Sequence, residues 1–164
     1  MTKKYYCVDD FRVGAQQRMP RVIFDYVDGA AGFETSSRLN RDIIDQIRLM
    51  PRVLVDIRER ELAKTFLGRT WTLPFGIAPM GMCNLAWPNT DKAFAAAAVD
   101  HDIPVCLSTF GSSSIEDMGE RASGNGWFQL YVGPSVDDAM DLVQRAEAAG
   151  YEYLVLTVDV PVVS

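Results

Sequence analysis

The pattern of hydrophobic residues in the last third of the chain predicts a strand, a helix and a second strand. Trp127 to Val132 and Tyr153 to Val160 are short apolar runs rich in aromatic and β-branched residues. Between them, Ser135 to Ala149 carries apolar residues at helical spacing; Pro134 suits the first helical position and Gly150 suits the residue that closes the helix. Strands that are apolar on both faces and joined by a helix are typical of a parallel sheet or barrel.

The first part of the chain shows two other patterns. Residues 8–47 carry apolar residues at helical spacing, and Tyr26 lies on one of these apolar stripes. Residues 53–73 alternate in the manner of β-strands, with a hairpin turn expected at residues 67–69. We expect a small β-ribbon ahead of the main fold, placed as a lid over the bottom of a barrel.

From Leu73 onward, strands and helices alternate with a period of about 25 residues, which is the rhythm of repeated βα units. The strand, helix and strand of the last third continue this repeat. The elements expected before them are a strand at 74–81, a helix at 91–100 with Thr90 as its N-cap, a strand at 104–109, and a short helix that a Ser113/Glu116 capping box begins and that ends near Ala122.

The alternation fits either an open doubly wound sheet or a (β/α)8 TIM barrel. The turn after the first strand, APMGMCN, lacks the G-x-G-x-x-G motif that a dinucleotide-binding sheet normally carries there. A barrel needs eight βα units, and this chain supplies four strands. We therefore expect residues 1–72 to be a helical and β-ribbon extension and residues 73–164 to be the first half of a barrel, whose other half lies on further polypeptide.

Four polar residues interrupt two of the apolar strands: Gln129 and Tyr131 in the first, Thr157 and Asp159 in the second. Each pair is spaced by two, so its side chains leave the same face of the strand, and each pair lies toward the C-terminal half of its strand. Ligands of parallel α/β folds bind at that end. One polar residue per strand is commonly a satisfied core group, but two such pairs favour a functional site.

Composition narrows the class of protein. The chain has 164 residues, 48% of them hydrophobic and 23% charged, as in globular proteins. A net charge of −6 without a Lys/Arg cluster argues against a nucleic-acid partner. Three cysteines without a CxxC pattern and a single histidine, His101, argue against a zinc site and favour a reducing cytoplasm. The same charge argues against an anionic membrane surface, and peripheral membrane association of another kind stays open.

Six segments, in order along the chain, resemble the FMN-dependent α-hydroxy-acid-oxidising enzymes, a family that includes glycolate oxidase, lactate oxidase and mandelate dehydrogenase. The resemblance covers essentially the whole chain, and six ordered matches are much more specific than one. It implies a (β/α)8 barrel with FMN at the C-terminal ends of the strands. The segments are FDYVDGAAG, NRDIIDQIRLMPRVL, LPFGIAPMGM, LSTFGSSSIED, WFQLY and LTVDVPV.

The resemblance also implies roles for matching residues around the flavin. A turn beside the ring would bring a backbone amide near the flavin N5 edge, and polar side chains would hydrogen-bond the ring heteroatoms. Glutamine suits this task because its amide offers both a donor and an acceptor. The turn residues are Pro79, Met80 and Gly81, and the polar residues are Ser108, Gln129 and Thr157.

For the substrate, the resemblance implies three roles. Tyr26 would hydrogen-bond the carboxylate of a 2-hydroxy acid, Tyr131 would face its hydroxyl group, and Asp159 would orient and stabilise a catalytic histidine. His101 lies between a helix end and a strand start, at the opposite end of the barrel, so it does not fit that role. The base is therefore expected in the C-terminal half of the barrel, and residues 1–164 alone are expected to be inactive.

Two positions bear on the electron acceptor, which could be O₂, a quinone or another molecule. Oxidases of the family commonly have Ala where this chain has Gly81, and the position of Phe110 is often Trp in short-chain oxidases. A missing methyl group beside the flavin changes the space that O₂ would meet, which slightly favours a dehydrogenase. A homo-oligomer is also expected.

Two other interpretations remain open from the sequence. A different flavin barrel, such as an isomerase, would keep the strand rhythm but not Tyr26 or the pair of Tyr131 and Asp159. A non-catalytic half-barrel would act as a scaffold. Flavin absorbance separates the scaffold from the enzymes, and reduction by a 2-hydroxy acid separates the two enzymes.

Overall fold

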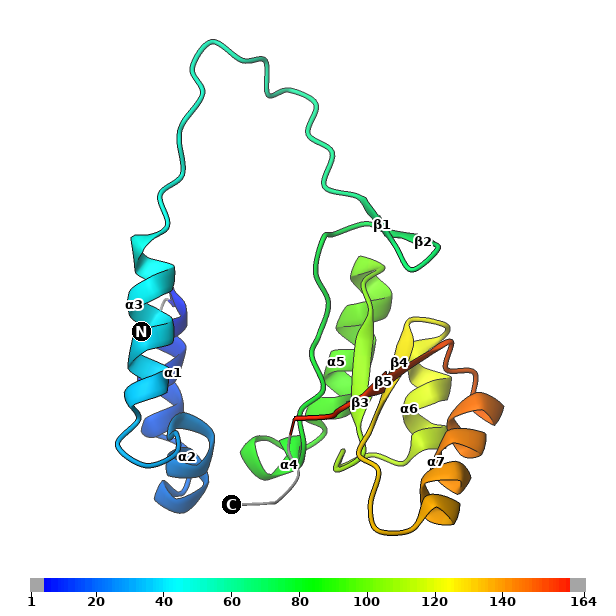
Figure 1. Ribbon diagram of the computed structural model, residues 1–164. Helices are drawn as coiled ribbons and strands as arrows, with labels where there is room; N and C mark the ends of the chain where they lie inside the picture. The colour runs from blue at the N-terminus through cyan, green and yellow to red at the C-terminus, as the bar shows by residue number, and fades with distance from the viewer. Residues whose placement is uncertain (1–4, 160–164) are drawn as a thin grey trace. The chain divides into compact units, whose positions relative to one another are not determined.

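The computed structural model describes residues 5–159, and its contacts divide the chain between Arg60 and Glu61 (Figure 1). The division expected after residue 72 would group the β-hairpin with the preceding helices. By its contacts the hairpin instead groups with residues 73–164. The domain boundaries proposed from the sequence remain a prediction.

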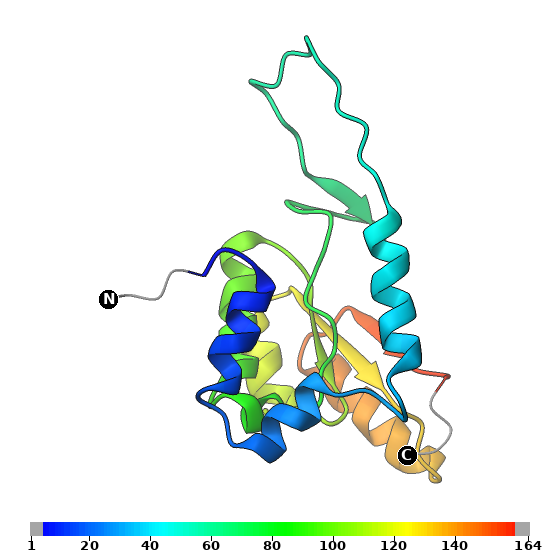
Figure 2. The ribbon, with the colours of Figure 1, turned by 90° about the vertical axis from the view of Figure 1, so that its left-hand side faces the viewer.

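The first unit contains three helices, seen in blue to cyan in Figure 2: α1 (Val8–Gln16), α2 (Arg21–Asp28) and α3 (Thr35–Gln46). The expectation of helices within residues 8–47 is confirmed. An ion pair between Arg12 and Asp28 joins α1 to α2. Tyr26, on α2, is 61% exposed within this unit. Residues 47–63 form neither helix nor strand, so the expected ribbon is shorter than the alternation indicated.

The second unit begins with an antiparallel hairpin of β1 (Lys64–Phe66) and β2 (Arg69–Trp71). Its turn is the one expected from the sequence. Leu67 and Gly68 have φ angles of 50° and 81°, and two residues with positive φ are what a tight hairpin turn requires. Glycine adopts this conformation without strain, whereas Leu67 does not.

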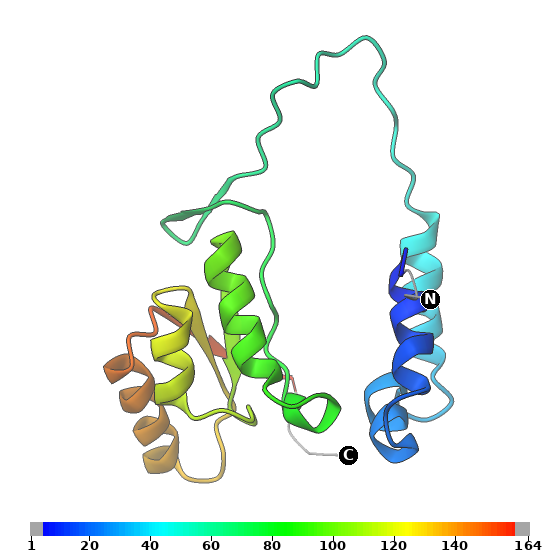
Figure 3. The same cartoon turned by 180° about the vertical axis from the view of Figure 1, so that it is seen from behind.

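A parallel sheet in the order β3-β4-β5 forms the centre of the second unit. Its strands alternate with helices α5, α6 and α7, which lie on one side of the sheet (Figure 3). The expected strand at 74–81 is reduced to one bridge between Ile77 and Val105, because Pro74, Pro79 and two glycines interrupt its ladder. The elements are α4 (Cys83–Ala86), α5 (Thr90–His101), β3 (Val105–Ser108), α6 (Ile115–Ala122), β4 (Gly126–Leu130), α7 (Val136–Ala148) and β5 (Tyr153–Leu156).

The helices begin at slightly different residues from those expected. Asn89, with a φ of 61°, replaces Thr90 as the N-cap of α5, and Ser114 replaces Ser113 as the N-cap of α6. Ser114 Oγ accepts a hydrogen bond from Asp117 N at 3.1 Å, so the capping interaction is shifted by one residue. Pro134, expected at the first helical position, lies outside α7: the helix begins at Val136, with Ser135 as its N-cap.

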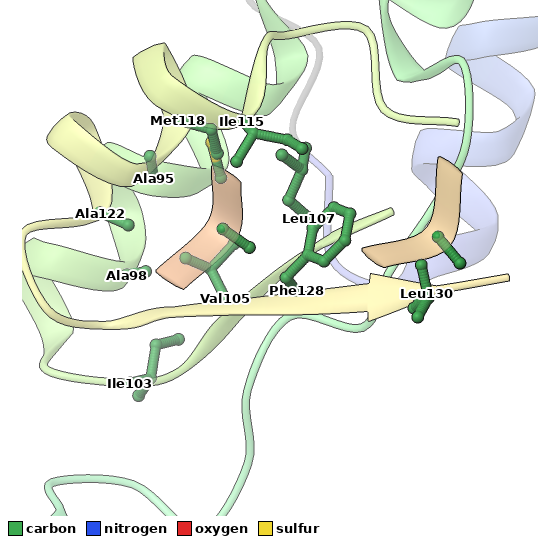
Figure 4. Packing of buried hydrophobic residues seen from close by; sticks show 12 residues of the cluster. Ala95, Ala98, Ile103, Val105, Leu107, Ile115, Met118, Ala122, Phe128 and Leu130 are labelled. Atoms are coloured by element: carbon green, nitrogen blue, oxygen red, sulfur yellow. The ribbon is translucent and has the colours of Figure 1, made fainter. Parts of the chain in front are cut away.

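The hydrophobic core lies between the sheet and its helices (Figure 4). Successive strand residues point to opposite faces, and the helix-facing set includes Val105, Leu107, Phe128 and Leu130. Small residues of α5 and α6 let these helices approach the strands closely. Because these side chains are almost fully buried, each large one stabilises the fold by about 1.5–3 kcal/mol.

The other face of the sheet lines an apolar cavity of about 420 Å³ near the amino ends of the strands. Cys106, Trp127 and Val155 contribute from the three strands, and Trp71 contributes from the hairpin. Burial raises the pKa of the Cys106 thiol to about 12, so this thiol is protonated at neutral pH and serves as an apolar group.

The hairpin covers the amino ends of the strands, as expected from the sequence. Arg69 donates to Gly124 O at 2.7 Å and to Asn125 Oδ1 at 2.7 Å, directly before β4. Tyr153, at the start of β5, donates from its hydroxyl to Leu67 O at 2.6 Å. The Trp71 ring lies 6.3 Å from the Trp127 ring, edge to face.

Candidate functional site

A row of polar side chains crosses the carboxyl ends of the three parallel strands. Ser108 Oγ donates to Gln129 Oε1 at 3.0 Å, and Gln129 Nε2 donates to Thr157 Oγ1 at 2.8 Å. β4 ends at Leu130 and β5 at Leu156, so Thr157 follows its strand directly. The structure therefore brings together three of the residues that the sequence predicted at this end.

The hydrogen bonds of Gln129 fix the orientation of its amide group. Its Oε1 accepts a second bond from Thr109 N at 3.2 Å, and a backbone N–H can only donate. Gln129 is only 2% exposed. With Oε1 occupied twice and one N–H given to Thr157, the second N–H of Gln129 and the hydroxyl hydrogen of Thr157 are still available to a ligand.

Ser108 has a different part in this row. Its hydroxyl donates to Gln129 and accepts from Phe110 N at 3.1 Å, so its single hydrogen is already used. It can offer a ligand only a remaining lone pair. Ser108 therefore holds Gln129 and the start of the following loop in place.

Thr109 was missed by the sequence analysis. Its hydroxyl donates to Gln129 O at 2.7 Å and accepts from Tyr131 N at 3.1 Å, which extends the link between β3 and β4 beyond the end of the ladder. A polar residue directly after a buried strand was the available signal. Its partners lie 20 and 22 residues away, and the sequence alone does not reveal them.

Two aromatic rings and a glycine lie next to this row. The rings of Phe110 and Tyr131 have centroids 5.5 Å apart. Met82 N donates to Phe110 O at 2.8 Å, which brings the loop after Ile77 beside the loop after β3. A Cβ added at Gly81 would lie 3.2 Å from Phe110 Cβ, which is a tight contact, so an alanine there requires Phe110 to shift.

The other residues of the Pro79–Met80–Gly81 turn have distinct surroundings. Pro79 lines the apolar cavity, and Met80 is 44% exposed. Met80 O accepts a bond from Cys83 Sγ at 3.4 Å. The turn is thus tied to the start of α4, while its Met80 side chain is accessible.

Three residues of interest do not belong to this row. Asp159 is exposed and follows Thr157 by two residues; Val160, the end of the expected strand, lies outside the described residues. Tyr26 belongs to the first unit. His101 is exposed in the last turn of α5, before the amino end of β3, as the sequence indicated.

Residues 5–159 contain no group of three or more His, Cys, Asp or Glu side chains arranged to hold a metal ion. Over the same part of the chain, no helix is sufficiently long and apolar to cross a membrane.

Comparison with known proteins gives one family. The sequence model of the family described as FMN-dependent dehydrogenase matches residues 15–164. The chain is 40% identical to (S)-mandelate dehydrogenase of Pseudomonas putida over 162 residues, covering 99% of this chain and 41% of that protein. It is 35% identical to 2-hydroxyacid oxidase 2 of Rattus norvegicus, covering 95% of this chain and 44% of that protein. The chain therefore spans less than half the length of these relatives.

A solved structure shows the same fold. The crystal structure of a soluble mutant of the membrane-associated (S)-mandelate dehydrogenase from Pseudomonas putida matches with a TM-score of 0.92 and 40% identity, covering 97% of this chain and 45% of that one. The predicted fold class is confirmed: this is the N-terminal part of a (β/α)8 barrel, with a preceding extension.

Proposed function

The chain belongs to the FMN-dependent dehydrogenase family, and on that premise we propose that it is the N-terminal part of an enzyme that oxidises an (S)-2-hydroxy acid to the 2-oxo acid. FMN, when bound, supplies the two-electron acceptor for this reaction. The residues of this chain bind the cofactor, hold the substrate and orient a base.

The observation that carries the proposal is the row of Ser108, Gln129 and Thr157 at the carboxyl ends of adjacent strands. Its two available donors, the second N–H of Gln129 and the hydroxyl hydrogen of Thr157, match the acceptor atoms of a flavin ring. Because Gln129 is buried and held by three hydrogen bonds, its donor is fixed in direction before a ligand arrives. We assign this row to the polar edge of the flavin.

The turn of Pro79, Met80 and Gly81 would lie against the flavin ring. Gly81 has no Cβ to separate its backbone from a planar ligand, and its backbone N–H can then reach the ring. The close approach of Phe110 supports the same assignment, because an alanine at position 81 would disturb both loops. We favour a dehydrogenase over an oxidase at this site, with a quinone or a similar molecule as the acceptor.

The substrate roles follow from hydrogen-bonding chemistry. Tyr131, whose ring contacts Phe110, would donate to the substrate hydroxyl oxygen, and Tyr26 would donate to the carboxylate. Asp159 would accept the ring N–H of a histidine base and stabilise that base when it gains a proton. None of the three roles requires a metal ion.

The proposal needs residues that this chain does not supply. We propose that a C-terminal half completes the barrel and brings the histidine base, the arginines that bind the carboxylate and a lysine near the flavin. Accordingly, residues 1–164 alone should not oxidise 2-hydroxy acids. Assembly as a homo-oligomer, and a cytoplasmic setting with or without contact to a membrane surface, belong to the same proposal.

Anaerobic flavin reduction tests this function. The full-length enzyme, carrying the complete barrel, should purify with FMN, and the oxidised flavin band should bleach on addition of (S)-mandelate, L-lactate or glycolate. For the two chiral substrates, (R)-mandelate and D-lactate are the matched controls and should leave the band unchanged. Purified full-length protein that does not bind FMN, or bound FMN that no 2-hydroxy acid reduces, would overturn the proposal. The second result would point to another flavin barrel enzyme, such as an isomerase.

Reoxidation separates a dehydrogenase from an oxidase. After reduction by substrate, the flavin of a dehydrogenase should regain its colour quickly with a quinone and slowly with O₂. Fast reoxidation by O₂ would identify an oxidase while leaving the oxidation of the hydroxy acid intact.

A further inference from the structure

A buried carboxylate sits behind the candidate site, on the helix side of the sheet. Asp91 is the second residue of α5 and only 4% exposed. Its Oδ2 accepts hydrogen bonds from Ser112 N and Ser113 N, both at 2.8 Å. These two amides belong to the loop of residues 109–113, which begins directly after Ser108. One oxygen of Asp91 thus anchors the far end of the loop that carries Phe110.

A second segment, residues 79–84, lies beside the start of α5, and its last two residues are the first two of α4. Burial, followed by the negative charge of Asp91, raises the pKa of the Cys83 thiol. The backbone of this loop is connected to the first loop as well, since Asn84 N donates to Ser112 Oγ at 3.1 Å. Asn84 Oδ1 also accepts from Thr90 N at 2.9 Å, beside Asp91.

Asp91 has no ion-pair partner among residues 5–159. Burying a charged carboxylate without a cation is unfavourable unless hydrogen-bond donors replace its water. Here the two loop amides and the N-terminal end of α5 fulfil that requirement. The hydrogen bonds from Ser112 N and Ser113 N form only when residues 109–113 are in the observed position. The loop thus stabilises the buried carboxylate of Asp91, and that carboxylate in turn holds the loop.

Both loops carry residues of the candidate flavin site. Residues 79–84 include the turn of Pro79, Met80 and Gly81, and residues 109–113 include Phe110, whose carbonyl accepts from Met82 N at 2.8 Å. A movement of either loop would change the contact between Gly81 and Phe110, where a single Cβ would already lie at 3.2 Å. Asp91 influences the contact between Gly81 and Phe110 indirectly, by holding the two segments that carry these residues.

We propose that Asp91 is a positioning residue that holds residues 79–84 and 109–113 at a fixed distance from the flavin ring and thereby tunes FMN affinity and reduction potential. The proposal rests on the proposed FMN-dependent function. It assigns Asp91 no contact with FMN or substrate.

Two substitutions at Asp91 separate its hydrogen bonds from its charge. Asp91→Ala removes the acceptor for both amides, whereas Asp91→Asn keeps an oxygen that can accept both bonds. Asp138 provides the matched control, because it is an exposed carboxylate in the first turn of α7. Asp138→Ala thus removes an acidic residue at a helix start without touching either loop.

The measurements use the full-length FMN-bound enzyme and its apo form. In Asp91→Ala, the dissociation constant of FMN should rise by on the order of ten- to a hundredfold, the range seen when the partner behind a metal ligand is lost. The flavin potential should shift and kcat should fall more than KM rises. Asp91→Asn should recover most of the affinity, and Asp138→Ala should match wild type.

Hydrogen exchange of the apo protein supplies a readout that does not depend on FMN. In Asp91→Ala, the amides of residues 79–84 and 109–113 should exchange faster, and those of β4 should not. Unchanged exchange in both loops overturns the inference even if FMN never binds. Faster exchange with FMN affinity and potential equal to those of wild type also overturns it, because Asp91 would then only stabilise the fold. Wild-type protein that binds no FMN overturns the proposed function instead, and with it the flavin part of this inference.

Discussion

The two ends of the same three strands differ in chemistry. At the amino ends, the ring of Trp71 in the hairpin packs on Trp127, and the Trp127 and Tyr153 centroids are 5.0 Å apart. At the carboxyl ends, the same face of the sheet carries Gln129 and Thr157, joined by a hydrogen bond of 2.8 Å. One end of the sheet is therefore apolar and closely packed, and the other carries polar side chains, at the end where (β/α)8 barrels bind their ligands.

Hydrogen bonding sharpens this difference. The indole nitrogens of Trp71 and Trp127 are buried without a hydrogen-bond partner among the described residues. Each such donor is unfavourable by about 1–3 kcal/mol, and the packing of the rings offsets that loss. At the opposite end, Gln129 is held by hydrogen bonds and still offers a donor. At the amino end, two indole N–H groups stay without an acceptor within apolar packing. At the carboxyl end, hydrogen bonds fix the orientation of the polar Gln129 amide.

The largest effect on stability is expected at the amino end. Trp71→Ala in the full-length enzyme should lower the free energy of unfolding by about 3–5 kcal/mol, since Trp71 is 2% exposed and its removal leaves a cavity. The potential of the bound FMN should stay unchanged. Denaturant unfolding and potentiometric titration measure the two quantities. A shifted potential with little loss of stability would contradict the division between the two ends.

A substitution at Asp159, which follows the carboxyl end of β5, should slow the reduction of the flavin by substrate. Asp159→Asn keeps the shape of the side chain and removes its charge, so the protonated histidine loses a stabilising partner. We expect kcat to fall by on the order of a hundredfold or more, with a smaller change in KM. Stopped-flow flavin reduction measures this rate. Reduction at the wild-type rate would show that Asp159 does not pair with the base.

Gln129→Leu tests the polar row itself. It keeps approximate size and removes both hydrogen-bonding functions, so FMN binding should weaken by about 1–3 kcal/mol or the flavin potential should shift. The hydroxyls of Ser108 and Thr157 also lose their partner. Titration of apoenzyme with FMN checks the affinity. If affinity and potential both stay at wild-type values, Gln129 is a core residue only.

The smallest effects are expected for two substitutions that each remove one hydroxyl group, one at the start of β5 and one directly after its end. Tyr153→Phe loses the bond to Leu67 O and should lower the free energy of unfolding by about 0.5–1.5 kcal/mol without changing FMN affinity. Thr157→Val loses the bond from Gln129 and should weaken FMN binding by a similar amount. Measuring unfolding and FMN affinity for both variants shows whether the effects separate. If both variants lose stability and FMN affinity to the same extent, the two ends of the strands do not differ in function.

Some features of the site could not be predicted because they depend on partners far along the chain. The bond from Ser108 reaches 21 residues and the bond from Gln129 to Thr157 reaches 28. The sequence marked Asp91 only as the start of a helix, yet its acceptor atom holds amides 21 and 22 residues away. The role and position of Tyr26, in the other unit, remain a prediction.

The sequence by itself determined the order of strands and helices, the parallel sheet and the end of the strands at which polar residues gather. These features follow from periodicity, since a side chain's face depends only on its position within its own element. Tertiary structure decided where β4 and β5 end, which loops meet behind the site, and which donors of Gln129 and Thr157 stay available. Those outcomes depend on hydrogen bonds between separate segments, and such bonds exist only after the segments have packed together.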